Sequence, residues 1–181
     1  MACDLLSLGR GIKCKDSVGG LANVYFINYA EVTGYTYDGT NTDVIETITG
    51  GGTINAYKYE LSTLLSSFNE VFNSDPNGTS WVEQTLVLNI NKQTLADHKE
   101  LKLITYGRPR VIIEDKNGNY KVMGLDYGAD VVTANANGGA AMTDPSGYEV
   151  TLMAREKIYA NFMEATNEAG LATAGLTVVT A

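Results

Sequence analysis

The chain has 181 residues, of which 44% are hydrophobic and 19% charged, a composition typical of one folded domain and not of a disordered chain. Its 13 basic and 21 acidic residues give a net charge of −8, which argues against tight nucleic-acid binding but not against a protein that nucleic acid slides past. No run approaches the ~18 apolar residues of a membrane span, and Met1–Asp4 lacks the basic start of a signal peptide. We therefore expect no membrane insertion and a cytosol-like compartment.

The first twenty residues predict an irregular N-terminal arm. Glycines interrupt any periodicity, and residues 13–17 are polar. Beyond the arm, β-branched and aromatic residues alternate with turn residues, and Tyr57 and Tyr59 share one face of a strand. The strands expected in the first half are Asn23–Tyr29, Val32–Tyr37, Asp43–Thr49, Thr53–Leu61, Ser66–Phe72 and Trp81–Asn91, the last two forming a hairpin.

One internal helix is predicted over Lys92–Ile104. Thr94 is a suitable N-cap, and Asp97 follows three residues later in the manner of a capping box. The hairpin Val111–Gly124 comes next and is the strongest local signal in the chain. Its Asn117-Gly118 pair between alternating apolar residues favours a type I′ turn, in which both central residues need a positive φ.

The last third predicts further β structure and a second arm. The expected segments are a loop at Ala134–Gly139, a turn at Asp144–Gly147, a strand at Tyr148–Met153, its extension or a helix at Arg155–Glu164, and a possible last strand at Thr177–Thr180. The fold class expected is mainly β, a β-sandwich or partly open barrel with one flanking α-helix. The domain spans residues 21–164, between an N-terminal arm (1–20) and a C-terminal arm (165–181).

No residue set indicates catalysis, a cofactor or a metal. His98 is the only histidine, and no Ser or Cys nucleophile pattern accompanies it. Asp115–Asn119 loosely resembles a calcium loop but lacks the full spacing and the glutamate at the twelfth position, so Asp115 and Asn117 are interpreted as turn formers; a carboxylate pair of Glu114-Asp115 with Asp144 is no stronger. The glycine-rich pieces form neither a dinucleotide fingerprint nor a P-loop. We expect a protein that is not an enzyme, with no catalytic, cofactor-binding or metal residues.

Other residues bear on partners and redox state. Cys3 and Cys14 are too few for a disulfide framework or a zinc site, so reduced thiols are favoured, although a short-loop disulfide stays possible. Arg108 and Arg110 form the only tight basic pair, which fits a phosphate, an acidic partner or a neighbouring subunit. The eleven tyrosines suit a half-buried interface, but β-propensity alone also explains them.

Two stretches of the chain carry a family resemblance. In the first, Cys14–Gly20 runs into Asn23–Tyr29; in the second, Thr105–Pro109 leads through the Asn117-Gly118 hairpin to Asp144–Tyr148. The combination resembles virion structural proteins of tailed bacteriophages, in particular the tail-tube and ring proteins of crAss-like and related phages of Bacteroidetes. The shared motifs are structural, so no functional residue is carried over.

The resemblance implies a virion subunit of the tail or neck, assembled in the cytoplasm of the bacterial host. Such proteins form homo-oligomeric rings or stacked rings and contact other tail or neck proteins. Their channel passes DNA transiently and without specificity during genome ejection, which an acidic wall would suit. The alternative is a β-sandwich binding module that recognises a host glycan or protein through exposed tyrosines and Trp81, in which case exposed aromatics should gather in one cleft.

Overall fold

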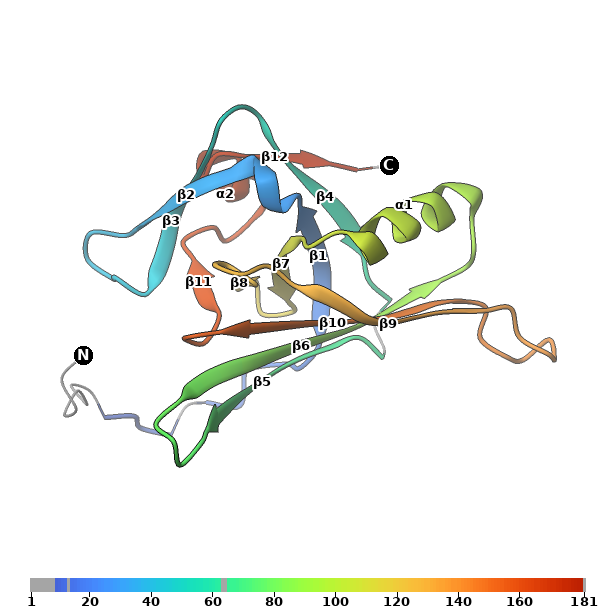
Figure 1. Cartoon of the computed structure of the whole chain (residues 1–181), viewed down its shortest axis with the longest axis horizontal. Coiled ribbons are helices and arrows are strands. Elements are labelled where there is room, and N and C mark those ends of the chain that lie inside the picture. Colours follow the sequence, from blue (N-terminus) through green and yellow to red (C-terminus); the bar gives the residue numbers. More distant parts are fainter. Residues whose placement is uncertain (1–8, 13, 63–64, 181) are drawn as a thin grey trace.

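The computed structural model describes residues 9–12, 14–62 and 65–180 (Figure 1). The strands are β1 (Leu21–Ile27), β2 (Val32–Tyr37), β3 (Val44–Gly50), β4 (Ile54–Glu60), β5 (Ser67–Ser74), β6 (Ser80–Asn91), β7 (Arg110–Asp115), β8 (Tyr120–Met123), β9 (Asp130–Asn137), β10 (Gly147–Glu156), β11 (Asn161–Met163) and β12 (Leu176–Val179). The helices are α1 (Leu95–Tyr106), α2 (Glu168–Thr173) and a 3₁₀ turn at Tyr29–Glu31. The prediction of a mainly β fold with a flanking helix is confirmed.

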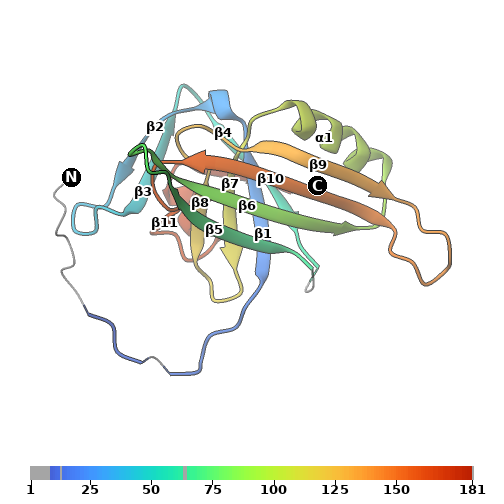
Figure 2. The same cartoon turned by 60° about the horizontal axis from the view of Figure 1, so that its bottom comes forward.

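Two sheets build the molecule. The larger has the order β12-β4-β1-β7-β8-β11-β3-β2 and curls into a half-barrel, and the smaller has the order β5-β6-β10-β9 and packs against it like the second layer of a sandwich (Figure 2). Every neighbouring pair in the smaller sheet is antiparallel. In both views β1 crosses the direction of β6 and β10, so the two layers pack at a steep angle.

Alternation along β1 divides the core in two. Tyr25 and Ile27 point into the half-barrel, where they join a cluster that includes Leu171 of α2. Val24 and Phe26 point the other way, into a second cluster shared with the smaller sheet and α1. Because side chains of a strand alternate between faces, one central strand contributes to both cores.

The helix α1 has the predicted cap, Thr94, but begins at Leu95, three residues after the predicted start at Lys92. The Thr94 hydroxyl oxygen accepts a hydrogen bond from the Asp97 amide (3.1 Å) and thereby caps the first turn. The helix runs to Tyr106, two residues beyond the predicted end, and Gly107 closes it by donating to the carbonyls of Leu103 and Ile104. Among the residues of α1 only Leu101 is buried, so α1 lies on the surface of the second core.

The hairpin of β7 and β8 forms in the predicted place, but its predicted turn type is wrong. Gly118 has a positive φ of 80°, whereas Asn117 does not. The Gly118 amide donates to the Asp115 carbonyl, and the Asp115 amide to the Asn119 carbonyl. This is a type I turn followed by a glycine bulge, which leaves the Asn117 side chain available for another contact.

Two segments of the last third differ from expectation. Residues 134–137 are predicted as loop but belong to β9, because full pairing with β10 overrides their low β-propensity. Within residues 165–180, predicted as an arm with a possible last strand at Thr177–Thr180, the strand is present as β12, and the unpredicted helix α2 precedes it; β12 pairs in parallel with β4, and Leu171 and Leu176 are buried. None of the helices in the described ranges is long and apolar enough to span a membrane.

Candidate assembly surfaces

The outer face of the smaller sheet is a polar surface. Alternate residues of β6 and β10 are buried against the larger sheet, and their neighbours point outward. The outward residues are Ser67, Asn69, Val71 and Asn73 of β5, Trp81, Glu83, Thr85, Val87 and Asn89 of β6, Glu149, Thr151, Met153 and Arg155 of β10, and Thr133 and Asn135 of β9. Arg155 pairs with Glu83 (3.2 Å), which leaves Glu149 to make the face weakly acidic.

The two edges of this sheet are long and carry exposed apolar side chains. Both β5 and β9 have eight residues, and each pairs with a neighbour on one side only. Val71 (48% exposed) and Phe72 (52%) lie on β5, and Val132 (55%) lies on β9. Neither strand contains lysine or proline, the residues that commonly protect sheet edges from pairing with another chain.

The turn of the β7–β8 hairpin holds the base of the N-terminal segment. The Val18 amide donates to Asn117 Oδ1 (3.0 Å), and Asn117 Nδ2 donates to the Val18 carbonyl (2.8 Å). The Lys116 amide also donates to the Gly20 carbonyl (3.2 Å). Two residues of the turn therefore fix the direction in which the chain leaves β1, while residues 9–12 and 14–17 are exposed.

An aromatic cleft of about 200 Å³ lies between α1 and the larger sheet. Phe26, Tyr29, Tyr57 and Tyr59 line one side, and Glu100 and Leu103 of α1 line the other. Tyr29 and Tyr57 are each more than a third exposed. Burial raises the pKa of Tyr59 to about 12, and the negative charges of Glu100 and Asp97 add smaller effects in the same direction. The Tyr59 hydroxyl therefore stays protonated.

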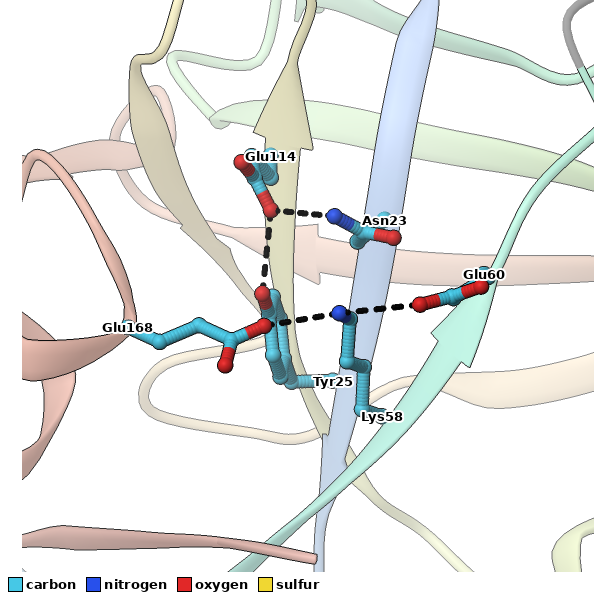
Figure 3. Close-up of polar contacts among 6 residues, drawn as sticks. All are labelled: Asn23, Tyr25, Lys58, Glu60, Glu114 and Glu168. Atoms are coloured by element: carbon cyan, nitrogen blue, oxygen red, sulfur yellow. Dashed lines mark hydrogen bonds and ion pairs between the residues drawn. The ribbon is translucent and has the colours of Figure 1, made fainter. Parts of the chain in front are cut away.

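A polar cluster closes one end of the half-barrel (Figure 3). Glu114 Oε2 accepts hydrogen bonds from the Tyr25 hydroxyl (2.9 Å) and from Asn23 Nδ2 (2.7 Å). Lys58 Nζ lies 2.7 Å from a carboxylate oxygen of Glu168 and 3.1 Å from one of Glu60, and so ties α2 to β4. Burial, followed by the hydrogen bond to Glu114, raises the pKa of Tyr25, which keeps this hydroxyl a donor.

A second polar cluster fixes the turn between β8 and β9. Arg110 Nε donates to the Leu125 carbonyl and Arg110 Nη1 to the Tyr29 carbonyl, both at 2.7 Å, and the guanidinium lies 4.2 Å from the Tyr29 ring centre. Glu156 Oε1 accepts the amides of Asp126 and Tyr127. Arg110 and Glu156 are bonded mainly to backbone, and the side chains of the first cluster are bonded to one another, so both clusters hold elements of the fold together.

The sequence-selected residues do not converge on a reaction centre. His98 Nδ1 lies 3.3 Å from the Tyr148 hydroxyl, and Asp144 accepts the amides of Ala140 and Ala141 within its own turn. Arg108 pairs with Asp130. No group of three metal-ligating side chains occurs in the part of the chain that the structure describes.

The paired arginines, the cysteines and the tryptophan are likewise separated. Arg108 is exposed, whereas Arg110 is buried and directed inward. Cys14 is exposed on the N-terminal segment, and Cys3 lies outside the described residues. Trp81 is paired with Asn73 in the smaller sheet and takes no part in the aromatic cleft. The sequence predicted neither the aromatic cleft nor the two hydrogen bonds between the Asn117 side chain and the Val18 backbone.

No family model matches the chain, and no curated protein matches its sequence. The function therefore has to be inferred from the molecule's own surfaces.

Proposed function

We propose that this protein is a non-enzymatic structural subunit of a bacteriophage virion, part of a tail tube or of a ring at the neck or tail. The resemblance of Cys14–Tyr29 and Thr105–Tyr148 to such proteins motivates the proposal. The observation that carries it is the pair of long edges on the smaller sheet, β5 and β9, each of which pairs with a neighbouring strand on one side only. A subunit with two such edges can bind copies of itself on both sides.

The directions of the two edge strands support a head-to-tail contact. Because β5, β6, β10 and β9 are successively antiparallel, β5 and β9 run in opposite directions. Joining β5 of one copy to β9 of the next therefore makes another antiparallel pair and continues the sheet. A repeated contact of this kind closes into a ring when the rotation per subunit allows it. Pairing would also cover Val71, Phe72 and Val132.

The outer face of the smaller sheet suits the wall of a channel. About half of its side chains are threonine, serine or asparagine, and its apolar members are Val71, Trp81, Val87 and Met153. It carries no lysine, and its one arginine is paired with Glu83. Affinity for nucleic acid comes chiefly from basic groups that neutralise phosphates. A polar and weakly acidic wall would let DNA pass without retaining it, which fits the net charge of −8.

The test is assembly of the purified full chain, followed by mass photometry and negative-stain electron microscopy. We expect rings or tubes from the wild type. Val132→Lys, which places a charge on the β9 edge, should stay monomeric with an unchanged circular dichroism spectrum. Thr177→Lys, a change at an exposed residue on the β12 edge of the other sheet, should assemble normally. A wild type that is monomeric at high concentration, or a Val132→Lys variant that assembles like it, would overturn the proposal.

The aromatic cleft favours one second candidate, a binding module for a host glycan or protein. Exposed Tyr29 and Tyr57 gather there beside Tyr59, as this function requires, although Trp81 does not join them. Aromatic faces beside a carboxylate suit the apolar faces and hydroxyls of a sugar. Saturable binding of an oligosaccharide by the monomer, lost in Tyr57→Ala, would support this candidate; a titration without saturation would exclude it for the sugar tested.

A further inference from the structure

The N-terminal segment differs in charge from the rest of the chain. Residues 9–15 contain Arg10, Lys13 and Lys15 and no acidic residue, within a chain of net charge −8. Its described residues are exposed, and the Ile12 side chain is completely so. A segment that combines an exposed apolar side chain with neighbouring basic residues is suited to bind a surface that is acidic and partly apolar. Residues 9–15 are called the basic arm below.

The aromatic cleft has the complementary chemistry. Tyr29, Tyr57 and Leu103 supply exposed apolar surface. Glu100 adds a carboxylate that has no ion-pair partner among the residues the structure describes. Arg108 also lines the cleft, but its charge is compensated by Asp130 (3.3 Å). Tyrosine rings attract cations through their faces, and a neighbouring carboxylate strengthens that attraction. The Tyr29 ring already lies 4.2 Å from the Arg110 guanidinium, which leaves Tyr57 as the exposed ring for a further cation.

We propose that the basic arm of one copy occupies the aromatic cleft of a second copy. This inference rests on the self-association proposed above and names a second contact within it. In an extended segment residues i and i+2 point the same way, so Arg10, Ile12 and Cys14 share one side. Ile12 then packs against Leu103 and the tyrosine rings, and the Arg10 guanidinium lies beside Glu100.

The cleft that receives the arm belongs to another copy because of the direction in which the arm leaves β1. The arm joins β1 at Leu21, whereas the cleft lies at the other end of β1, at Phe26 and Tyr29. These ends are about 20 Å apart at the rise of an extended strand. Asn117 holds Val18 at the far end from the cleft, and in both Figure 1 and Figure 2 the segment leads away from α1.

Disulfide trapping in the full chain tests the contact, since Cys14 is a native probe on the arm. The variant is Cys3→Ser with Leu103→Cys, oxidised and then run on a non-reducing gel. Because each copy both donates an arm and offers a cleft, we expect a ladder of covalent oligomers. Adding Cys14→Ser should abolish the ladder. Thr79→Cys in place of Leu103→Cys, an exposed position on the β5–β6 turn, should give none.

A charge exchange separates a specific contact from chance collision. Glu100→Lys in the trapping variant should lower the ladder yield by about fivefold, and Arg10→Glu added to it should restore the yield. A cross-link only at the monomer mass would place the arm in its own cleft and overturn the inference. Covalent oligomers that still form after Cys14→Ser would also overturn the inference. Rings of the wild type without covalent oligomers in the trapping variant would overturn the arm contact and leave the proposed function intact. A ladder without rings would instead refute the ring and keep the arm contact.

Discussion

Removing the Asn117 side chain should release the N-terminal segment without unfolding the domain. Asn117→Ala deletes both hydrogen bonds to the Val18 backbone. The turn itself should survive, because Asn117 adopts no positive φ and Gly118 supplies the one that the bulge needs. The Lys116 amide keeps its contact with Gly20, so the chain stays attached at the start of β1.

The size of the effect follows from the two lost contacts. A typical hydrogen bond contributes about 0.5–1.5 kcal/mol net, and exposed ones lie at the lower end. Two of them at an exposed site are worth roughly 1–2 kcal/mol for local opening, which corresponds to about 5- to 30-fold in the opening equilibrium. The free energy of global unfolding should change by less than about 0.5 kcal/mol, because the core does not depend on this segment.

Hydrogen exchange of the Val18 amide, followed by NMR, measures this opening directly, since that amide donates to Asn117. We expect faster exchange at Val18 and unchanged exchange in β7 and β8. Asn119→Ala is the matched control, because the Asn119 side chain bonds only Asp115 within the turn. If Val18 exchange were accelerated equally in Asn119→Ala, or not at all in Asn117→Ala, the Asn117 side chain would not be what holds the Val18 backbone in place.

Three further predictions concern stability. Gly118→Ala should lower the free energy of unfolding in urea by about 1 kcal/mol, because the φ of Gly118 is 80° but no atom lies within 4 Å of the added Cβ. Gly124→Ala should lower it by about 3 kcal/mol or more, because the added Cβ would meet backbone atoms at 2.7 Å, and equal losses in the two variants would contradict this packing. Partial burial would raise the pKa of Asp115, but hydrogen bonds from two turn asparagines outweigh it and lower that pKa. The ionised Asp115 carboxylate therefore contributes to stability above about pH 4, and this contribution is lost as the pH falls through the lowered pKa. Asp115→Asn should be less stable than wild type at about pH 7, and the difference in Tm between the two proteins should narrow below about pH 3. Lys58→Met should lower the free energy of unfolding by about 1 kcal/mol, because the ion pairs with Glu60 and Glu168 are lost, and the loss should be smaller at high salt. A loss of stability that does not depend on salt would exclude these ion pairs as the cause.

Local signals in the sequence predicted most elements that depend on neighbouring residues. Thr94 marks the start of α1, and the turn residues of Val111–Gly124 mark the β7–β8 hairpin, because caps and turns are determined within a few positions. β9 was missed because residues 134–137, Ala-Asn-Ala-Asn, have little β-propensity and gain their conformation from β10. In the same way, α2 is ordered by burying Leu171 in a core formed by distant strands.

The candidate surfaces depend on contacts that no local pattern encodes. The alternation of β4 predicts that Tyr57 and Tyr59 share a face, but only the fold brings Glu100 opposite them. The contact of Asn117 with Val18 joins residues 99 positions apart. The type I turn also explains why Asn117 was interpreted only as a turn former: once Gly118 takes the positive φ, the asparagine side chain is available to bind.

The edges and the arm point to one contact between neighbours. The Leu61 amide donates to the Ala22 carbonyl, so the chain leaves β4 beside the start of β1, from which the arm also leaves, and β5 begins six residues after Leu61. On the opposite side α1 carries one wall of the aromatic cleft and lies next to β9 (Figure 2). In the proposed ring, a copy that offers β5 and its arm would therefore meet β9 and the cleft of the next copy together. Once one contact has formed, the other becomes effectively intramolecular, which strengthens the pair without either having to be strong alone. On this reasoning, Glu100→Lys should raise the protein concentration needed for ring assembly without altering the shape of the rings, whereas Val132→Lys should prevent assembly at any concentration tested.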